Sequence, residues 1–130
     1  MKNKHLAYAV DFLAFLLEDL DIEEVKNIIL FGSTARNEIT KESDIDLFID
    51  VVGNIKENKI NVGRILDNFY NSKFYKNYWK IKGIKNQINI KVGRLDEWQD
   101  LKQSIMSAGI VLYSKFKDTP QDARHHTLIY

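Results

Sequence analysis

The hydrophobic positions near the start of the chain recur at helical spacing. Leu6, Val10 and Leu13 begin a stripe that predicts an amphipathic helix over residues 4–20. The next apolar run, residues 25–31, is almost continuous toward its end, which is typical of a strand covered on both faces. We therefore expect a helix that leads directly into a buried strand.

This strand ends abruptly at Gly32-Ser33, and a second strand is expected after a short connection. Serine is a good N-cap residue, so a short helix is expected to begin at Ser33. This second strand is expected over residues 44–52, and it contains the apolar run Leu47-Phe48-Ile49. Because side chains alternate between the faces of a strand, Asp44 and Asp46 should point the same way, while the apolar residues beside them face the core.

The middle of the chain is expected to form a helix followed by a hairpin. Apolar residues at helical spacing predict a helix over residues 57–71. Residues 75–92 contain two segments that alternate at period two, with Gly83 to Asn86 between them. This pattern predicts two strands joined by a turn.

The rest of the chain completes a single mixed domain over residues 1–130. A helix is expected from Leu95 to Gly109, where glycine is a natural stop, and a short last strand at 110–113. Residues 114–130 are interpreted as a tail. The alternative is that the given chain is a truncated form of a longer one. The predicted fold class is α/β (α+β), a small mixed sheet flanked by helices.

The composition is that of a globular chain without a strong charge bias. Its 130 residues carry a net charge of +1 and no cysteine, which excludes disulfides and thiolate metal sites. No run reaches the ~18 apolar residues that a membrane span needs. We expect a soluble cytoplasmic protein, and its net charge gives no argument for nucleic-acid or membrane binding.

The Gly32-Ser33 turn and the carboxylate pair together indicate phosphate chemistry. Glycine lets the backbone approach a ligand closely, and a helix N-terminus presents N–H groups that suit a phosphate. Asp44 and Asp46 repel each other unless a cation lies between them, and such pairs suit Mg²⁺. Phosphoryl transfer needs a phosphate anchor together with a metal ion. Neither motif is specific alone, but their order and spacing favour this function.

The string GSTARNEITKESDIDLFI, from Gly32 to Ile49, resembles the signature of the polymerase-beta-type nucleotidyltransferases. It is especially similar to the small minimal nucleotidyltransferases of bacteria and archaea. The resemblance is specific over residues 25–52 and compatible over the rest. It implies a nucleotidyltransferase fold, in which the Gly-Ser turn holds the triphosphate and the two aspartates hold Mg²⁺. The implied reaction moves a nucleoside monophosphate from a nucleoside triphosphate to an acceptor hydroxyl, with loss of pyrophosphate.

The resemblance also bears on partners and on a third phosphate contact. Small domains of this family often work with a helical protein partner, and related antitoxin-like proteins modify a toxin partner in this way. The acceptor hydroxyl therefore belongs to a protein, a small molecule or an RNA. Arg36 is expected near the phosphates, and Asn37 replaces a glycine that many relatives carry there, a change that the tolerance of Asn for left-handed backbone should permit.

One departure from the family pattern concerns a third carboxylate. Active members usually carry it on a later strand, as a metal ligand or as the base for the attacking hydroxyl. The strand available here, 88–92, has Asn89 and Lys91 at its polar positions. Asp50 shares a face with Asp46, but it lies about 13 Å further along the strand, too far to share a metal.

The missing acid leaves several interpretations open. Asp96 and Glu97 follow the strand and are further candidates, and Lys91 is a candidate to replace part of a metal's positive charge. Without a third acid the chain is a weakened enzyme, or one whose substrate supplies the base. The alternative is a module that binds nucleotide or a partner without turnover, and a structural subunit is the third option.

Residues 71–95 carry seven basic side chains and no acid, interleaved with aromatic residues. Such a combination binds nucleic acid or triphosphates in other proteins. A hairpin with solvated lysines and buried rings explains the same pattern, and we favour that interpretation. His125 and His126 are interpreted as part of a flexible tail rather than a metal pair. Three further residues are expected in the core: Trp98, Leu101 and Ile105.

Overall fold

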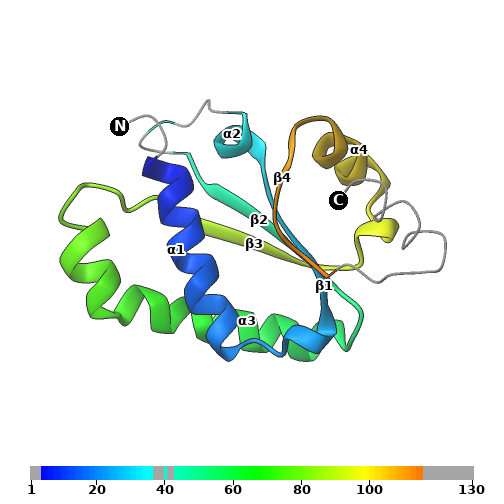
Figure 1. The fold of residues 1–130 in the computed structure, drawn as a ribbon, viewed down its shortest axis with the longest axis horizontal. Helices are drawn as coiled ribbons and strands as arrows, with labels where there is room; N and C mark the ends of the chain where they lie inside the picture. Colours follow the sequence, from blue (N-terminus) through cyan, green and yellow to red (C-terminus); the bar gives the residue numbers. More distant parts are fainter. Residues whose placement is uncertain (1–3, 37–39, 41–42, 116–130) are drawn as a thin grey trace, which may run out of the picture.

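The computed structural model describes residues 4–36, 40 and 43–115, which form a four-stranded mixed sheet with helices on both faces (Figure 1). The main elements are α1 (Lys4–Asp19), β1 (Val25–Phe31), α2 (Gly32–Ala35), β2 (Ile45–Val51), α3 (Ile55–Asn71), β3 (Ile88–Gly93), α4 (Gln99–Ala108) and β4 (Ile110–Ser114). Short helical turns separate them at η1 (Ile22–Glu24), η2 (Tyr75–Trp79) and η3 (Leu95–Glu97). The predicted mixed fold is confirmed.

The strands lie in the order β3-β2-β1-β4. β1 is antiparallel to both β2 and β4, whereas β3 is parallel to β2. A parallel pair needs a long crossover, which α3 and η2 supply here. The register sets Asp46 opposite Phe31 on β1 and opposite Asn89 on β3. The second carboxylate therefore lies at the centre of the sheet, between these two strands.

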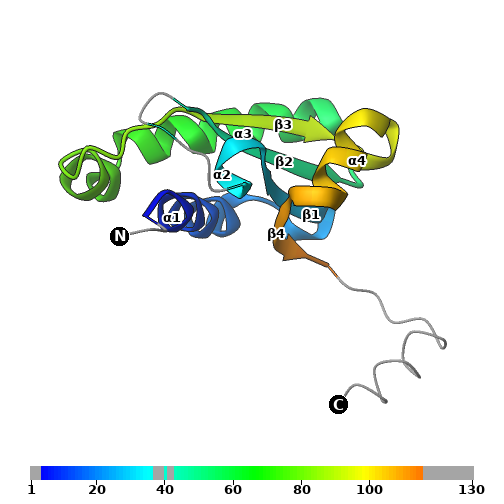
Figure 2. The ribbon, with the colours of Figure 1, turned by 90° about the horizontal axis from the view of Figure 1, so that it is seen from above.

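The main core lies between one face of the sheet and the helices α1 and α3. Ile45, Leu47 and Ile49 of β2 are fully buried there, together with Phe12 of α1 and Phe69 of α3. The rings of these two phenylalanines meet edge-on, with centroids 5.2 Å apart. Figure 2 shows α1 and α3 running along the sheet. Every second residue of β2, from Ile45 to Ile49, thus packs in this core.

The residues that the structure describes cover the opposite face of the sheet only in part. A small cluster of Ile29, Phe48 and Ile105 packs α4 against one end of this face. Toward the start of β2 and β3 the same face presents Asp46, which is half-buried, and Asn89, which is exposed. The uncovered part of this face is where polar side chains from two neighbouring strands meet.

The predicted hairpin over residues 75–92 is wrong, because only its second strand forms. That strand is β3, and it pairs in parallel with β2. The chain after α3 instead makes a turn of π-helix, η2, in which the Lys80 amide donates to the Tyr75 carbonyl, five residues earlier, at 2.9 Å.

The alternation that suggested the first strand of the hairpin has a different cause. Trp79 is buried against α1, where Tyr8 meets it edge-on and Asp11 accepts its indole N–H at 2.9 Å. Tyr78 and Ile81 on either side of it are exposed. One buried indole among exposed neighbours therefore gives an alternation over four residues that resembles a strand pattern.

The remaining predicted helices and strands form within two residues of their expected bounds. The helix expected from Leu95 is divided into η3 and α4, and α2 begins at Gly32 rather than at Ser33. Of the three expected core residues, Ile105 is buried and Leu101 half-buried, but Trp98 is 39% exposed. The segment 116–130, with its two histidines, lies outside the described residues. Among the helices that the structure describes, none has both the length and the apolar character to cross a membrane.

Candidate functional site

The turn that ends β1 packs directly against the second carboxylate. Gly32 has a φ of +73°, a left-handed conformation that residues with a side chain rarely adopt. A Cβ on Gly32 would collide with Asp46 Oδ2 and lie 3.3 Å from Asp46 Cγ. Only glycine therefore allows both this turn and this close approach. Ser33, the next residue, is half-buried at the start of α2.

The carboxylate pair lies at the start of β2, as the alternation predicts. Ile45 and Leu47 are fully buried on the core face, while Asp44 is exposed and Asp46 half-buried on the opposite face. Two like charges so close together disfavour each other's ionised form. The burial of Ile45 and Leu47 agrees with the predicted alternation, and the shared direction of the two aspartates stays a prediction.

The environment of Asp46 raises its pKa above the ordinary value for an aspartate. Burial, which penalises the charged form, is the largest cause, and the charge of Asp44 acts in the same direction. The hydrogen bond from Asn89 and the positive charges of Lys91 and Arg36 oppose this shift in the pKa. The ionised form of Asp46 thus lacks full compensation within the protein, as expected for a group that meets a cation.

An amide occupies the position beside Asp46 where a third carboxylate was sought. The Asn89 amide Nδ2 donates a hydrogen bond to Asp46 Oδ1 at 3.3 Å across the β2–β3 pair. Lys91 lies two residues further along the same face, opposite Phe48. Its Nζ lies 5.9 Å from the ring centroid of Trp98, which itself packs edge-on against Phe48. The site therefore continues past the aspartates as an amide, an ammonium and an indole.

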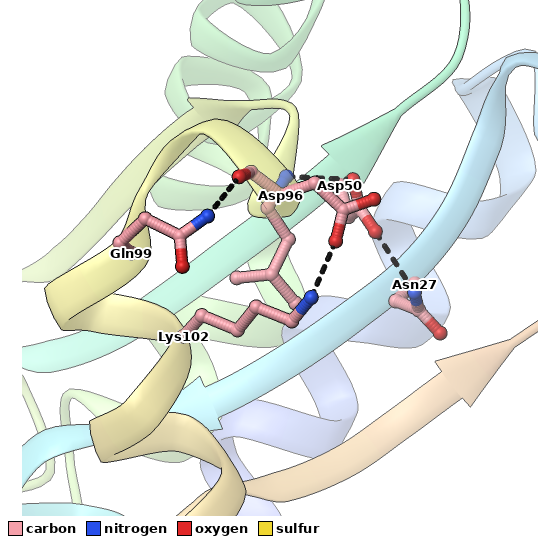
Figure 3. Close-up of polar contacts among 6 residues, drawn as sticks. Asn27, Asp50, Asp96, Gln99 and Lys102 are labelled. Atoms are coloured by element: carbon pink, nitrogen blue, oxygen red, sulfur yellow. Dashed lines mark hydrogen bonds and ion pairs between the residues drawn. The ribbon is translucent and has the colours of Figure 1, made fainter.

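Of the other acids considered as third carboxylates, Asp50 and Asp96 have structural partners, and Glu97 is exposed on η3. Asp50 is 6% exposed, and it accepts hydrogen bonds from Asn27 Nδ2 at 2.9 Å and from the Leu95 amide at 3.0 Å. Figure 3 shows its carboxylate between β1 and the start of η3. Asp96 is exposed and pairs with Lys102 at 2.6 Å, a hydrogen bond that lowers its pKa. Asp50 thus ties η3 to the sheet, and Asp96 ties η3 to α4.

The connection in front of Asp44 is held by a residue that the sequence pattern did not single out. The side-chain amide of Asn86 is 5% exposed and donates to the carbonyls of Thr40 at 3.0 Å and Ser43 at 2.7 Å. The Tyr8 hydroxyl donates to the Asn86 carbonyl at 3.2 Å. The sequence predicts a turn at Asn86, whereas the residue lies in the irregular segment between the turn at 80–83 and β3. Its role depends on contacts about 40 residues away in sequence, which no local pattern contains.

The other predicted phosphate ligand, Arg36, is exposed just after α2. Its amide donates to the Gly32 carbonyl at 3.2 Å, which closes the short helical turn. Its charge lowers the pKa of Asp46, against the larger effect of burial, so the side chain lies within electrostatic range of the pair. Asn37 lies outside the described residues.

An open hollow of about 400 Å³ lies on the Asp44 side of the site, at the outer edge of β3. Gln87 lines it and accepts the Ile45 amide through its carbonyl at 2.8 Å, and the Tyr70 hydroxyl accepts the Ile88 amide at 2.8 Å. The charge of Asp44 contributes, after burial, to a raised pKa of Tyr70. The remaining lining residues are Tyr75 and Lys85. This hollow offers aromatic and cationic groups, of which Tyr70 lies within electrostatic range of Asp44.

The donor set fits a hard divalent cation in part. Within residues 4–36, 40 and 43–115, no three His, Cys, Asp or Glu side chains gather into a metal-binding group. Mg²⁺ is usually held by one or two carboxylates together with substrate phosphates and water. Asp44 and Asp46 match that smaller requirement, provided that a phosphate ligand completes the coordination.

The basic and aromatic stretch is divided between core and surface. Trp79 is buried and Tyr75 half-buried, as the favoured interpretation requires for the rings. Phe74 and Tyr78, however, are 48% and 43% exposed and stack on each other with an interplanar angle of 10°. The prediction of buried rings is therefore correct for only part of the stretch.

The fold, the glycine turn and the carboxylate pair define a nucleotidyltransferase-like domain. The nucleotidyltransferase domain family model matches residues 11–112, and the chain belongs to this family. The sequence has no significant match among curated proteins. Family and fold together support a general link to nucleotidyl transfer.

Solved structures share this fold at low sequence identity. A protein of Sulfolobus solfataricus assigned as a nucleotidyltransferase is 16% identical, with a TM-score of 0.53 over 86% of this chain and 82% of its own. A toxin–antitoxin complex with AMP-PNP is 15% identical, with a TM-score of 0.54 over 99% and 83% of the two chains. A mutant of the toxin–antitoxin complex MntA-HpeT is 14% identical, with a TM-score of 0.53 over 92% and 80%.

Proposed function

We propose that this chain transfers a nucleoside monophosphate from a nucleoside triphosphate to an acceptor hydroxyl. The observation that carries the proposal is the packing of the Gly32 backbone against the Asp46 carboxylate. It brings the turn suited to phosphate into contact with the side chain suited to Mg²⁺, so that one triphosphate can meet both. A glycine turn or a carboxylate pair alone would support no such reaction.

Each residue of the site has a role in this proposal. The Gly32-Ser33 turn and Arg36 hold the triphosphate, and Asp44 and Asp46 hold Mg²⁺. When bound, Mg²⁺ would neutralise negative charge on the phosphates as it develops. The acceptor oxygen bonds to the α-phosphorus as the bond to pyrophosphate breaks.

The proton of the acceptor hydroxyl also needs a destination. Asn89, which lies beside Asp46, is an amide and cannot act as a base at neutral pH. We therefore assign the proton to a base on the acceptor or to solvent. This assignment makes the reaction dependent on the acceptor that is supplied.

We propose that the acceptor is a hydroxyl on a helical protein partner. Two of the solved structures with this fold are toxin–antitoxin complexes, and one of them contains AMP-PNP. Those descriptions support a triphosphate donor and a protein acceptor for a chain of this shape. The open hollow at the outer edge of β3, lined in part by Tyr70 and Tyr75, offers space for a group of such a partner.

Transfer of label tests the proposal directly. The chain is incubated with its genomic neighbour or with host lysate and an α-³²P-labelled triphosphate, and labelled acceptors are separated on gels. Combined Asp44→Asn and Asp46→Asn changes should abolish labelling. Asp67→Asn, an exposed carboxylate on α3, is the matched control and should leave it unchanged. Labelling that survives the double change would remove both aspartates from the chemistry.

Asn89 specifically favours a second candidate function, a module that binds a triphosphate without turning it over. An amide beside Asp46 keeps the hydrogen bond but supplies neither a base nor an anionic metal ligand. This alternative predicts Mg²⁺-dependent binding of a triphosphate by calorimetry without release of pyrophosphate. Pyrophosphate release that requires Asp44 would exclude it.

A further inference from the structure

The number of carboxylates on the site face limits how many metal ions it can hold. Sites with two ions hold them about 3.5–4 Å apart and share anionic ligands between them. Within the described part of the chain, Asp44 and Asp46 are the acids at this end of β2, and no third acid or histidine joins them. The neighbouring position on β3 holds Asn89, whose amide donates to Asp46 Oδ1 at 3.3 Å. An amide at this position adds no anionic ligand for a second ion.

Lys91 supplies positive charge on the same face. Lys91 follows Asn89 by two residues in β3, so both side chains share the face that carries Asp46. Lys91 is half-buried, its Nζ lies near the Trp98 ring, and it forms no salt bridge within the described residues. An ammonium on the same face as a carboxylate pair, within electrostatic range of Asp46, can serve phosphate oxygens as a metal ion would.

We propose that this site holds a single divalent cation, at Asp44 and Asp46, and that Asn89 and Lys91 occupy the place of a second one. Asn89 excludes the second ion because its neutral amide stands beside Asp46 where a carboxylate would supply an anionic metal ligand. Lys91 contributes the missing positive charge toward the triphosphate. This inference rests on the proposed function, and it adds the number of ions and the residue that compensates for the absent one.

Electron paramagnetic resonance of Mn²⁺ distinguishes one bound ion from two. The full chain is titrated with Mn²⁺ in the presence of an α,β-methylene triphosphate, which cannot be turned over. The unmodified chain should bind one Mn²⁺ with the spectrum of an isolated ion. Asn89→Asp should bind two ions whose spectra show spin coupling, because a carboxylate at this position can bridge them. Asn89→Ala is the matched control, since it removes the hydrogen bond without adding a ligand, and it should still bind one ion.

The outcomes separate this inference from the function on which it rests. A coupled Mn²⁺ pair in the unmodified chain would overturn the single-ion inference and leave the proposed transferase intact. A single ion in Asn89→Asp would also overturn it, because the amide would then not be what excludes the second ion. No bound Mn²⁺ in the unmodified chain would remove the metal site itself and the proposed function with it. Circular dichroism confirms that each variant is folded.

A second measurement tests the role of Lys91. Lys91→Gln should weaken binding of the Mn²⁺-triphosphate analogue about tenfold in calorimetry, while the count of one ion is unchanged. Lys76→Gln, an exposed lysine on η2, serves as the control for loss of overall charge. Equal affinities for Lys91→Gln and the unmodified chain would show that Lys91 does not take part.

Discussion

Gly32 at the end of β1 and Asp46 in β2 lie so close that a methyl group on the glycine would collide with the carboxylate. The Gly32 φ of +73° adds a second requirement for glycine. Alanine at this position should therefore cost about 1–2 kcal/mol of folding free energy and displace the Asp46 side chain. We expect Gly32→Ala to lower both the unfolding midpoint in urea and the affinity for an Mg²⁺-triphosphate.

Gly83 provides a matched control for this substitution. Its φ of +81° is equally left-handed, but a Cβ there meets no atom within 4 Å. Gly83→Ala should thus carry the conformational cost alone and bind the triphosphate as the unmodified chain does. If the two variants lose the same stability and neither loses binding, the contact with Asp46 has no functional consequence.

A second prediction concerns the pH dependence of stability. Because the pKa of Asp46 is raised by folding, the folded protein holds this proton more tightly than the unfolded chain. Its ionised form therefore destabilises the fold at pH values above the raised pKa, and the penalty disappears below the ordinary pKa of an aspartate. Asp46→Asn, which keeps the shape and removes the charge, should raise the Tm by a few degrees at pH 7 and by nothing near pH 3.

Added Mg²⁺ with a triphosphate analogue should reverse the order of thermal stability of the unmodified chain and the Asp46→Asn variant. Mg²⁺ with a triphosphate analogue binds the native state of the unmodified chain and should raise its Tm in proportion to occupancy, whereas Asp46→Asn should show no such gain. Differential scanning calorimetry of both proteins at three pH values, with and without the ligand, measures each of these Tm values. A variant that is less stable than the unmodified chain at pH 7 without metal would contradict the burial of an uncompensated charge.

The sequence predicts the part of the site that depends on local periodicity. Alternation along one strand is sufficient to place Asp44 and Asp46 on one face, because Ile45 and Leu47 must both enter the core. The glycine turn follows from the abrupt end of the apolar run at Phe31. These inferences need only a few consecutive residues.

Pairing between distant segments is what the sequence did not predict. The alternation around Trp79 indicated an antiparallel hairpin, whereas β3 pairs in parallel with β2 after a π-helical turn. Only that register shows that Asn89, rather than Lys91, lies directly opposite Asp46. The burial of Trp79 depends on Tyr8 and Asp11, about 70 residues earlier. The alternation around Trp79 therefore could not be interpreted from its sequence neighbours alone.

A third prediction addresses how the connection before Asp44 is positioned. Asn86 donates to two carbonyls of this connection, at Thr40 and Ser43, from a buried position. Asn86→Ala should destabilise the fold by about 1–3 kcal/mol, because two partly buried hydrogen bonds are lost. It should also weaken triphosphate binding, although Asn86 itself has no substrate role. Asn61→Ala, an exposed residue of α3, is the control for both measurements.

Hydrogen exchange shows whether the two effects of Asn86→Ala have one cause. The Ile45 amide donates to the Gln87 carbonyl at 2.8 Å, directly beside the changed residue. Its exchange should accelerate more than that of the Ile49 amide in the middle of β2. Uniform acceleration along β2 would mean that the variant is only less stable, and that the connection is not specifically released.

The last prediction separates a structural carboxylate from a site carboxylate on the same strand. Asp50 is buried and accepts hydrogen bonds from Asn27 and from the Leu95 amide, whereas Asp44 is exposed. Asp50→Ala leaves two donors unpaired and should cost about 2–4 kcal/mol, while Asp44→Ala should change stability by less than about 0.5 kcal/mol. Metal binding should follow the opposite order: the folded fraction of Asp50→Ala binds Mn²⁺ normally, and Asp44→Ala does not. Urea unfolding and Mn²⁺ titration of the same two preparations give both results, and a loss of Mn²⁺ binding in folded Asp50→Ala would mean that the metal site reaches further along β2 than Asp46.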